Sequence, residues 1–201
     1  MRKLRRSGIL IYGVGINDAD YCIEYLDEIT NKRKKCIFYK KWVGMLERCY
    51  SDKLKIKHPT YKDCSVVPEW LSFMNFRRWM EKQDWKGKQL DKDLLFEGNK
   101  LYGPDNCVFV DRKVNTFVLD CGAVKGDYPT GVSFHQHTGK YQAQCHQSDK
   151  SKYLGVFDTP DEAHSVWREA KHKQATILAG QQTDKRVADA LIKRYCKGVI
   201  K

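Results

Sequence analysis

The sequence predicts an α+β protein built from two domains. Apolar residues recur at helical spacing in two N-terminal segments, 38–50 and 70–80. After residue 128 they instead alternate with polar residues over three short runs, which is typical of an antiparallel sheet with one wet face. A strong helix start follows that sheet. We expect a first domain over residues 1–119, a linker over 120–127, and a second domain over 128–201, in which a three-stranded antiparallel sheet packs on a helix.

Charge indicates the class of partner. Lys and Arg number 37 and Asp and Glu number 25, a formal net charge of +12. This excess favours a polyanionic partner, because each cation that neutralises a phosphate releases a counterion. No apolar run approaches the ~18 residues that a spanning helix needs, and the apolar stretch after the basic N-terminus is too short for a signal peptide. We therefore expect a cytoplasmic protein with no membrane partner, and the sequence leaves its oligomeric state open.

Eight cysteines are spread along the chain, and none forms a C-x-x-C pair. Zinc ribbons use such pairs, and disulfides need an oxidising compartment to which nothing in the sequence points. Buried free thiols are the expected state. A metal cluster of Cys49, Cys64 and Cys107 is the alternative.

The N-terminal part of the first domain is predicted to be helical. Tyr21, Tyr25, Leu26 and Ile29 suggest one helix face, with Asn17 or Asp18 as its cap. A helix is expected over Phe38–Tyr50, a polar connection over 51–64, and a second helix that opens at Pro68 and continues to Met80. Five basic residues lie off the apolar helix faces and could contact either a nucleic-acid backbone or only solvent: Lys40, Lys41, Arg48, Arg77 and Arg78.

The stretch 90–115 carries the residue types that can hold a metal against a phosphate. Its apolar runs and turns predict strand, loop, strand and helix. In that arrangement Asp91, Lys92 and Asp93, at the end of one strand, could face Asn106 and Asn115 across a small cleft. The alternative is structural: Asp91 and Asp93 fix the loop through backbone amides and an ion pair with Lys92 or Lys100.

The second domain is predicted as a meander followed by two helices. Val132, Phe134, Tyr141, Ala143 and Cys145 alternate with polar residues, and turns at 138–139 and 148–149 separate the strands. Thr159, Pro160 and Glu162 then supply the cap, the first helical position and the capping box of a helix. A further helix is expected from about residue 184.

Residues 128–179 resemble the plant ethylene-response-factor type DNA-binding domain as it occurs in phage homing endonucleases. The resemblance rests on Gly131-Val132, Gly139-Lys140-Tyr141, Ala143, Leu154-Gly155, Phe157-Asp158-Thr159 and Glu162-Ala163. It implies that the sheet lies in the major groove of double-stranded DNA. The DNA-binding residues that it implies here are Ser133, His135, Lys140, Gln142, Gln144, His146, Lys152 and Tyr153. Ser, His and Gln stand where the plant pattern has guanine-reading arginines, and Gln can bind adenine with two hydrogen bonds, which implies a different target.

Residues 38–117 resemble phage proteins identified as HNH endonucleases. The match runs through Trp42, Arg48-Cys49-Tyr50, His58-Pro59, Glu69-Trp70, Leu90-Asp91-Lys92-Asp93, Gly98-Asn99-Lys100 and Cys107 to Asn115. It implies an HNH-like ββα core in the N-terminal domain. The implied catalytic residues are Asp91, Lys92, Asp93, Asn106 and Asn115, and the implied ligands of a divalent metal, Mg²⁺ or Mn²⁺, are Asp91, Asp93 and Asn115.

The departure from the HNH motif leaves the activity open. Lys92 stands where the family has its histidine, and a lysine is a poor general base unless burial lowers its pKa far. Asp93 or His58 could serve instead. One hypothesis is a double-stranded DNA-binding protein of homing-endonuclease type that nicks DNA with a metal, in the cytoplasm of the host cell if a phage encodes it. The other is a catalytically inactive DNA-binding regulator or antagonist of a host system, and a third is a module that binds an acidic protein.

Overall fold

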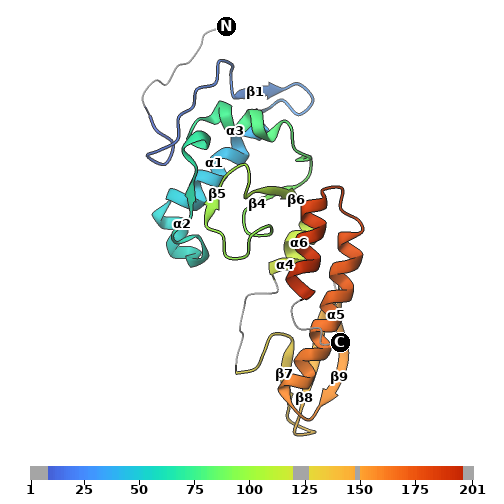
Figure 1. The fold of residues 1–201 in the computed structure, drawn as a ribbon. Coiled ribbons are helices and arrows are strands. Elements are labelled where there is room, and N and C mark those ends of the chain that lie inside the picture. Colours follow the sequence, from blue (N-terminus) through green and yellow to red (C-terminus); the bar gives the residue numbers. More distant parts are fainter. Residues whose placement is uncertain (1–8, 120–126, 148–149, 197–201) are drawn as a thin grey trace. The chain divides into compact units, whose positions relative to one another are not determined.

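The structure is a computed structural model that describes residues 9–119, 127–147 and 150–196, without the side chains of 147 and 150. It is an α+β protein, as predicted, and the described residues form helices and four small sheets (Figure 1). The chain divides into two compact units, Met1–Phe109 and Val110–Lys201. Except for Asp127, the expected linker 120–127 lies outside the described residues.

The division after Phe109 differs from the expected end of the first domain at residue 119. Helix α4 (Arg112–Leu119) belongs to the second unit. Its Phe117 carbonyl accepts hydrogen bonds from Lys171 Nζ at 3.4 Å and from Tyr195 Oη at 3.2 Å, and both donors lie on helices of that unit. The two donors lie 54 and 78 positions after Phe117 in the sequence. No local sequence pattern predicts contacts over such separations.

A β-hairpin replaces the helix expected around Tyr21–Ile29. Strands β1 (Glu24–Asp27) and β2 (Lys32–Lys35) pair in antiparallel register. The Asp27 carboxylate accepts the backbone N–H of Thr30 and the ammonium of Lys34, and Asn31 takes a positive φ of 49° in the turn. These bonds lower the pKa of Asp27 to about 2, with Lys34 the main cause. Local turn chemistry therefore overrode a weak helical spacing.

Asp18, expected to cap that helix, caps a different one. Its carboxylate accepts hydrogen bonds from Ser72 Oγ at 2.6 Å and from the backbone N–H of Met74 at 2.9 Å, at the start of helix α3 (Phe73–Met80). Pro68–Leu71 forms a separate 3₁₀ helix, η2, so the helix expected from Pro68 to Met80 is interrupted. The interruption arises because Ser72 is extended and its neighbours pair with Ile16: the Ile16 N–H donates to Leu71 and the Phe73 N–H donates to Ile16.

The core of the first unit lies between α1 (Ile37–Tyr50) and α3, and the α1 prediction is confirmed to within one residue. Trp42, Leu46, Phe73 and Phe76 have no exposed surface. The Trp42 indole also donates a 2.7 Å hydrogen bond to the Trp70 carbonyl, so its polar atom is satisfied inside the core.

The expected polar connection 51–64 contains two short helices. Ser51 caps α2 (Asp52–Lys57) by accepting the N–H of Leu54, and the 3₁₀ helix η1 (Pro59–Tyr61) follows. The α2 helix buries no residue, so it lacks the apolar face that makes a helix visible in a sequence.

The stretch 89–119 has the predicted order of strand, loop, strand and helix. Strand β4 (Gln89–Asp91) pairs with β6 (Val108–Val110), which leads into α4. Between them the loop contains a further strand, β5 (Leu101–Tyr102), which pairs in parallel with β3 (Ser65–Val66). The loop is therefore tied to the segment that follows η1.

The second unit contains the predicted meander and both predicted helices. Strands β7 (Val132–His135), β8 (Lys140–Gln147) and β9 (Lys150–Phe157) form an antiparallel sheet in that order. Helix α5 (Pro160–Ala179) begins with the expected capping box at Thr159 and packs on the sheet. Helix α6 (Lys185–Cys196) packs against α5 (Figure 1).

Seven cysteines are described, and all are free. The expectation of buried thiols holds for Cys49, Cys64, Cys107 and Cys145, whereas Cys22 and Cys196 are exposed. Burial raises the pKa of the Cys49 and Cys107 thiols to about 12, which disfavours the thiolate that a metal would need. Among the described residues, no three His, Cys, Asp or Glu side chains gather as metal ligands would.

None of the helices within the described part of the chain has the length and apolar character that a membrane span requires.

Candidate functional site

The outer face of the β7–β9 sheet is formed by alternate residues of each strand. Ala143 and Cys145 of β8 are fully buried, and Gln174 of α5 donates to the Cys145 sulfur, so these positions face the helix. Gln142, Gln144 and His146 therefore point to the opposite face. The residues directly across from them share that face: Ser133 and Val156 flank Gln142, Tyr153 flanks Gln144, and Ser151 flanks His146.

Most of these side chains are accessible. Gln144, His146 and Ser133 are exposed, and Tyr153 keeps 58% of its surface. Gln144 accepts a 3.4 Å hydrogen bond from the Ser151 hydroxyl, which orients its amide. Within the described residues, no hydrogen bond ties the side chains of His146 or Tyr153 to the protein. The outer face thus presents amide, imidazole and hydroxyl groups to solvent.

Two further predicted DNA contacts lie at the β7–β8 turn and have local partners. The His135 ring nitrogen Nδ1 is 2.9 Å from Thr138 Oγ1, and the His135 carbonyl accepts the N–H groups of Thr138 and Gly139. Lys140 forms an exposed ion pair with Asp158 at 2.8 Å, and this partner raises the pKa of the lysine. A phosphate that contacts Lys140 would compete with Asp158.

Lys152 does not belong to the outer face. The register places it opposite Cys145, on the side of the sheet that α5 covers. A β-bulge shifts the pairing after Ala143, so Leu154 has no partner of its own and Tyr153 takes the outer position. An unbroken register would have put Lys152 beside His146, because a shift of one residue exchanges the two faces.

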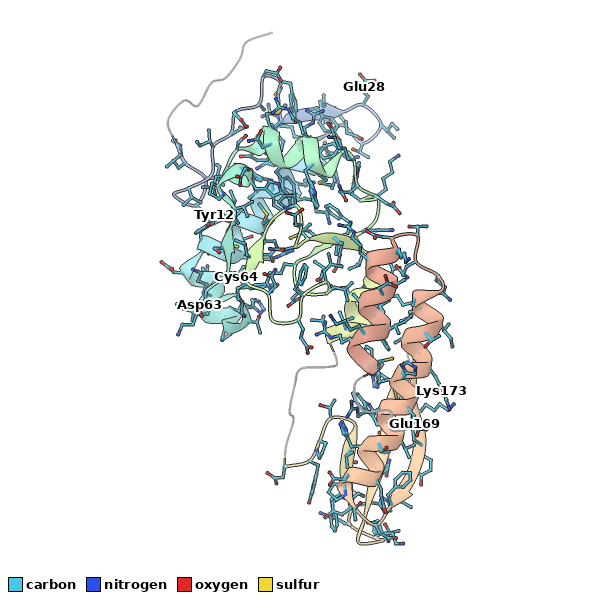
Figure 2. All side chains as sticks on the ribbon, in the orientation of Figure 1. Tyr12, Glu28, Asp63, Cys64, Glu169 and Lys173 are labelled. Carbon is cyan, nitrogen blue, oxygen red and sulfur yellow. The ribbon has the colours of Figure 1, made fainter. Side chains whose placement is uncertain are left out.

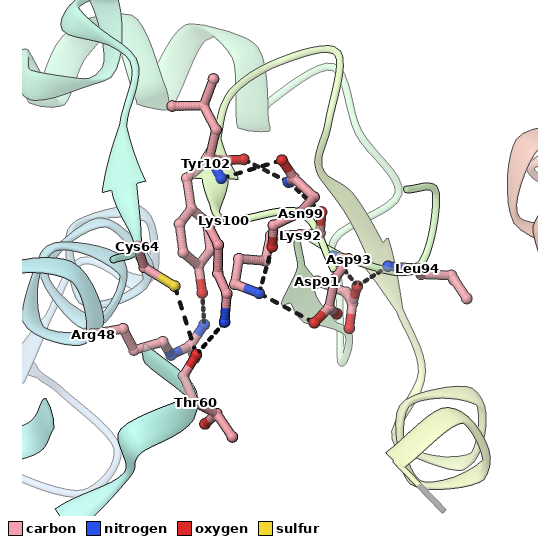
Figure 3. Close-up of polar contacts among 11 residues, drawn as sticks. Arg48, Thr60, Cys64, Asp91, Lys92, Asp93, Leu94, Asn99, Lys100 and Tyr102 are labelled. Atoms are coloured by element: carbon pink, nitrogen blue, oxygen red, sulfur yellow. Dashed lines mark hydrogen bonds and ion pairs between the residues drawn. The ribbon is translucent and has the colours of Figure 1, made fainter. Parts of the chain in front are cut away.

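The carboxylate site in the first unit is a tightly bonded loop (Figure 3). Asp91, the last residue of β4, accepts the backbone N–H groups of Asp93 at 2.9 Å and of Leu94 at 2.7 Å through a single oxygen, Oδ1. The buried Lys92 ammonium donates to Asp93 Oδ2 at 3.1 Å and to the Asn99 carbonyl at 2.9 Å. The Asn99 amide returns a 2.7 Å bond to the Lys92 carbonyl.

The electrostatics of this loop follow from burial. Burial raises the pKa of Asp91, and the adjacent Asp93 carboxylate raises it further, although the two backbone N–H groups oppose the shift. The Asp93 side chain is 45% exposed, whereas that of Lys92 is 8% exposed. A half-exposed carboxylate therefore lies beside a partly buried one, and an ammonium ion already balances part of their charge.

Asp91, Lys92 and Asp93 of the predicted set lie together in the first unit. Asn106 lies in the turn before β6, where its backbone N–H donates to Gly103, and no described contact joins it to the aspartates. Asn115 lies on α4 in the second unit. His58, the alternative base, is exposed and packs edge-on against Tyr61, with ring centroids 6.2 Å apart.

The bonds of Asp91 and Lys92 are those of the structural alternative considered above. The sequence did not predict the roles of Asn99 and Asp111. The Asn99 amide stabilises the loop by donating to the Lys92 carbonyl. The Asp111 carboxylate caps α4 by accepting the Val114 N–H at 2.8 Å. The signal for Asn99 was the Gly98-Asn99 turn, and that for Asp111 was an aspartate just before a helix.

Four of the five basic residues proposed as backbone contacts have partners inside the first unit. Lys41 donates to the Lys88 carbonyl, Arg48 lies near the Tyr102 hydroxyl, and Arg77 stacks on the Tyr21 ring 4.5 Å away. Arg78 is exposed and donates a 3.0 Å hydrogen bond to Asn75 Oδ1, and Lys40 is exposed.

Comparison with protein-family models, with curated proteins and with solved structures gives no significant match to this chain. The two family resemblances therefore stay predictions.

Substitution of Asp91 tests whether the carboxylate is structural. Asp91→Ala removes the acceptor of two backbone N–H groups and should destabilise the protein by about 2–3 kcal/mol. Asp91→Asn keeps an oxygen acceptor and should cost less than about 1 kcal/mol at neutral pH. Urea unfolding of both variants measures the difference.

The same pair has a predicted pH dependence. The pKa of Asp91 is higher in the folded state than in the unfolded state. The free energy of unfolding should therefore decrease as the pH rises from the pKa of Asp91 in the unfolded chain through its pKa in the folded protein. The stability of Asp91→Asn relative to the unsubstituted protein should therefore increase over that interval. A difference that is constant with pH would contradict the raised pKa.

Proposed function

We propose that this protein binds double-stranded DNA through the outer face of β7–β9. The observation that carries the proposal is the row formed by Gln142, Gln144 and His146. These side chains lie on one face at alternate positions, while the other face is packed against α5. A strand face that only contacts solvent does not require amide and imidazole side chains at successive outward positions.

The dimensions of this face suit the major groove. Three strands span about 10 Å, since neighbouring strands lie about 4.8 Å apart, and the groove is about 12 Å wide. Alternate residues along a strand are about 6.8 Å apart, close to the rise of two base pairs at about 3.4 Å each. Glutamine can form two hydrogen bonds with adenine, and the net charge of +12 favours the polyanion.

Selection from a random duplex library tests this proposal. The full-length protein should enrich a recurring sequence. The double variant Gln144→Ala/His146→Ala should then lose about 10- to 100-fold in affinity for that sequence and less than about threefold for random duplexes. Fluorescence anisotropy at one fixed salt concentration measures both.

The matched control is Lys173→Gln, on the exposed side of α5 (Figure 2). It should lower affinity slightly and equally for all sequences. If no sequence is enriched, or if the double variant weakens every duplex equally, then the outer face does not read bases.

Metal-dependent nicking is a second candidate function, and it rests on the adjacent Asp91 and Asp93 carboxylates. Mg²⁺ and Mn²⁺ prefer such oxygen ligands. The fit is poor, however, because Lys92 already pairs with Asp93, and one Asp91 oxygen is held by two N–H groups. We therefore infer no catalytic step through a metal, and we favour a DNA-binding regulator or an antagonist of a host system.

A plasmid assay separates these two functions. Supercoiled DNA incubated with the protein and Mg²⁺, Mn²⁺ or EDTA should remain intact while its mobility shifts. Metal-dependent nicks that disappear in Asp91→Asn and Asp93→Asn would overturn the non-catalytic choice.

A further inference from the structure

The segment from α2 through η1 is a basic, exposed part of the first unit outside the sites described above. Within 52–62 the chain has four lysines, Lys53, Lys55, Lys57 and Lys62, and one acidic residue, Asp52. Lys53, Lys57 and Lys62 are exposed. We call these three side chains the α2 lysines.

Like Lys32, Lys82 and Lys86, the α2 lysines have no acidic partner among the described residues, whereas several other cations do. Ion pairs engage Lys34, Lys35, Arg77, Lys88, Lys92, Lys140 and Arg186. In the ranges that the structure describes, no carboxylate lies within ion-pair distance of Lys53, Lys57 or Lys62. Their charge is therefore available to an external anion, and no internal ion pair has to be broken for it to bind.

The segment is firmly attached to the rest of the first unit. Lys100 Nζ donates to the Thr60 carbonyl at 2.8 Å (Figure 3). The Lys100 carbonyl accepts the Ser65 N–H at 2.9 Å, through the parallel pairing of β3 with β5. The α2 lysines are thus presented on an ordered backbone, with only their flexible side chains left to adapt.

We propose that the α2 lysines form a second DNA contact, which holds the sugar–phosphate backbone of a duplex without regard to its sequence. The inference rests on the proposed function, because it takes its polyanion to be the duplex that the sheet reads. Lysine suits this task, since its ammonium is a point charge on a flexible stem and needs no fixed geometry. Ile56 is the one strongly exposed apolar side chain of α2, so the surface offers charge rather than an apolar groove.

The test compares two triple variants that remove the same charge. Lys53→Gln/Lys57→Gln/Lys62→Gln removes the α2 lysines. Lys32→Gln/Lys82→Gln/Lys86→Gln removes three exposed lysines of the same unit that lie on other segments. Strand β1, the partner of the strand that carries Lys32, lies well away from α2 (Figure 1). Neither variant breaks an ion pair of the described residues, so circular dichroism and the Tm should remain unchanged.

Affinity for the enriched duplex and for a random duplex is then measured at 50–300 mM KCl. The α2 variant should lose about two orders of magnitude near 0.1 M salt for both duplexes, and the slope of log K against log salt should become shallower by about 2–3. The control variant should change the slope by less than about 1.

Each outcome has a definite meaning. If the unsubstituted protein binds DNA and the two triple variants behave alike, the α2 contact is wrong while the proposed function stands. If the unsubstituted protein binds no duplex, both fail. If the α2 variant loses binding to phosphatidylserine vesicles but keeps its duplex affinity, the surface recognises membrane headgroups, which overturns the inference.

Discussion

Gly131→Ala is expected to destabilise the second unit by about 3 kcal/mol or more, since a positive φ costs an alanine about 1–2 kcal/mol and overpacking adds about 1–3 kcal/mol. Gly131 precedes β7 with a φ of 83°, and a Cβ there would overlap Cδ1 of Trp167. The indole is held by stacking on His164, whose ring bonds the Thr130 carbonyl, so it cannot move freely. Guanidinium unfolding followed by tryptophan fluorescence measures the loss.

Gly139→Ala is the matched control. Gly139 has a similar φ of 65° in the β7–β8 turn, but nothing lies within 4 Å of an added Cβ. Gly139→Ala should destabilise the protein by only about 1–2 kcal/mol, which is the cost of placing an alanine at a positive φ. Equal losses in the two variants would mean that the Trp167 contact is not the cause. Because Gly131 leads directly into the strand of Ser133, its substitution should also weaken DNA binding.

Lys171→Ala should destabilise the second unit by about 3–4 kcal/mol, because it removes a large buried side chain and a cation–π contact of about 2 kcal/mol. Lys171 is 1% exposed, and its ammonium lies 4.2 Å from the centre of the Phe117 ring and 5.8 Å from those of Trp167 and Tyr195. It therefore binds α4, α5 and α6 to one another.

Lys171→Met separates volume from charge. Methionine fills most of the space and avoids burying an ammonium, so the loss should fall to about 1 kcal/mol. Thermal unfolding of the two variants gives the comparison. If methionine proved as harmful as alanine, the interaction of the charge with the aromatic rings and the Phe117 carbonyl would be the larger contribution.

The elements that the sequence predicted correctly are those whose signals are local. Helix α1 has a wide apolar face, α5 has its capping box at Thr159, and the β7–β9 strands alternate between turns. The β1–β2 hairpin and α2 were missed because neither buries an apolar face: Tyr25 and Leu26 are more than half exposed, and α2 buries nothing. An exposed element leaves no periodicity to detect.

The candidate sites were predicted only as far as neighbours in sequence determine them. Asp91, Lys92 and Asp93 do lie together, but Asn115 joins the other unit through contacts of Phe117 with residues far along the chain. The outer face of the sheet followed from alternation, but the alternation did not predict the bulge that places Lys152 opposite Cys145 and Tyr153 opposite Gln144. Bulges and distant contacts depend on tertiary packing, which local patterns do not record.

The assignment of α4 to the second unit determines how the half that we propose to bind DNA can be transplanted. A fragment cut at residue 128, where the sheet region starts, would lack Phe117 and leave the Lys171 ammonium and the Tyr195 hydroxyl without the carbonyl that they share. A fragment cut at Val110 retains all three helices that meet at that lysine. The portable module therefore begins about twenty residues before the sheet whose surface it would carry into a fusion protein.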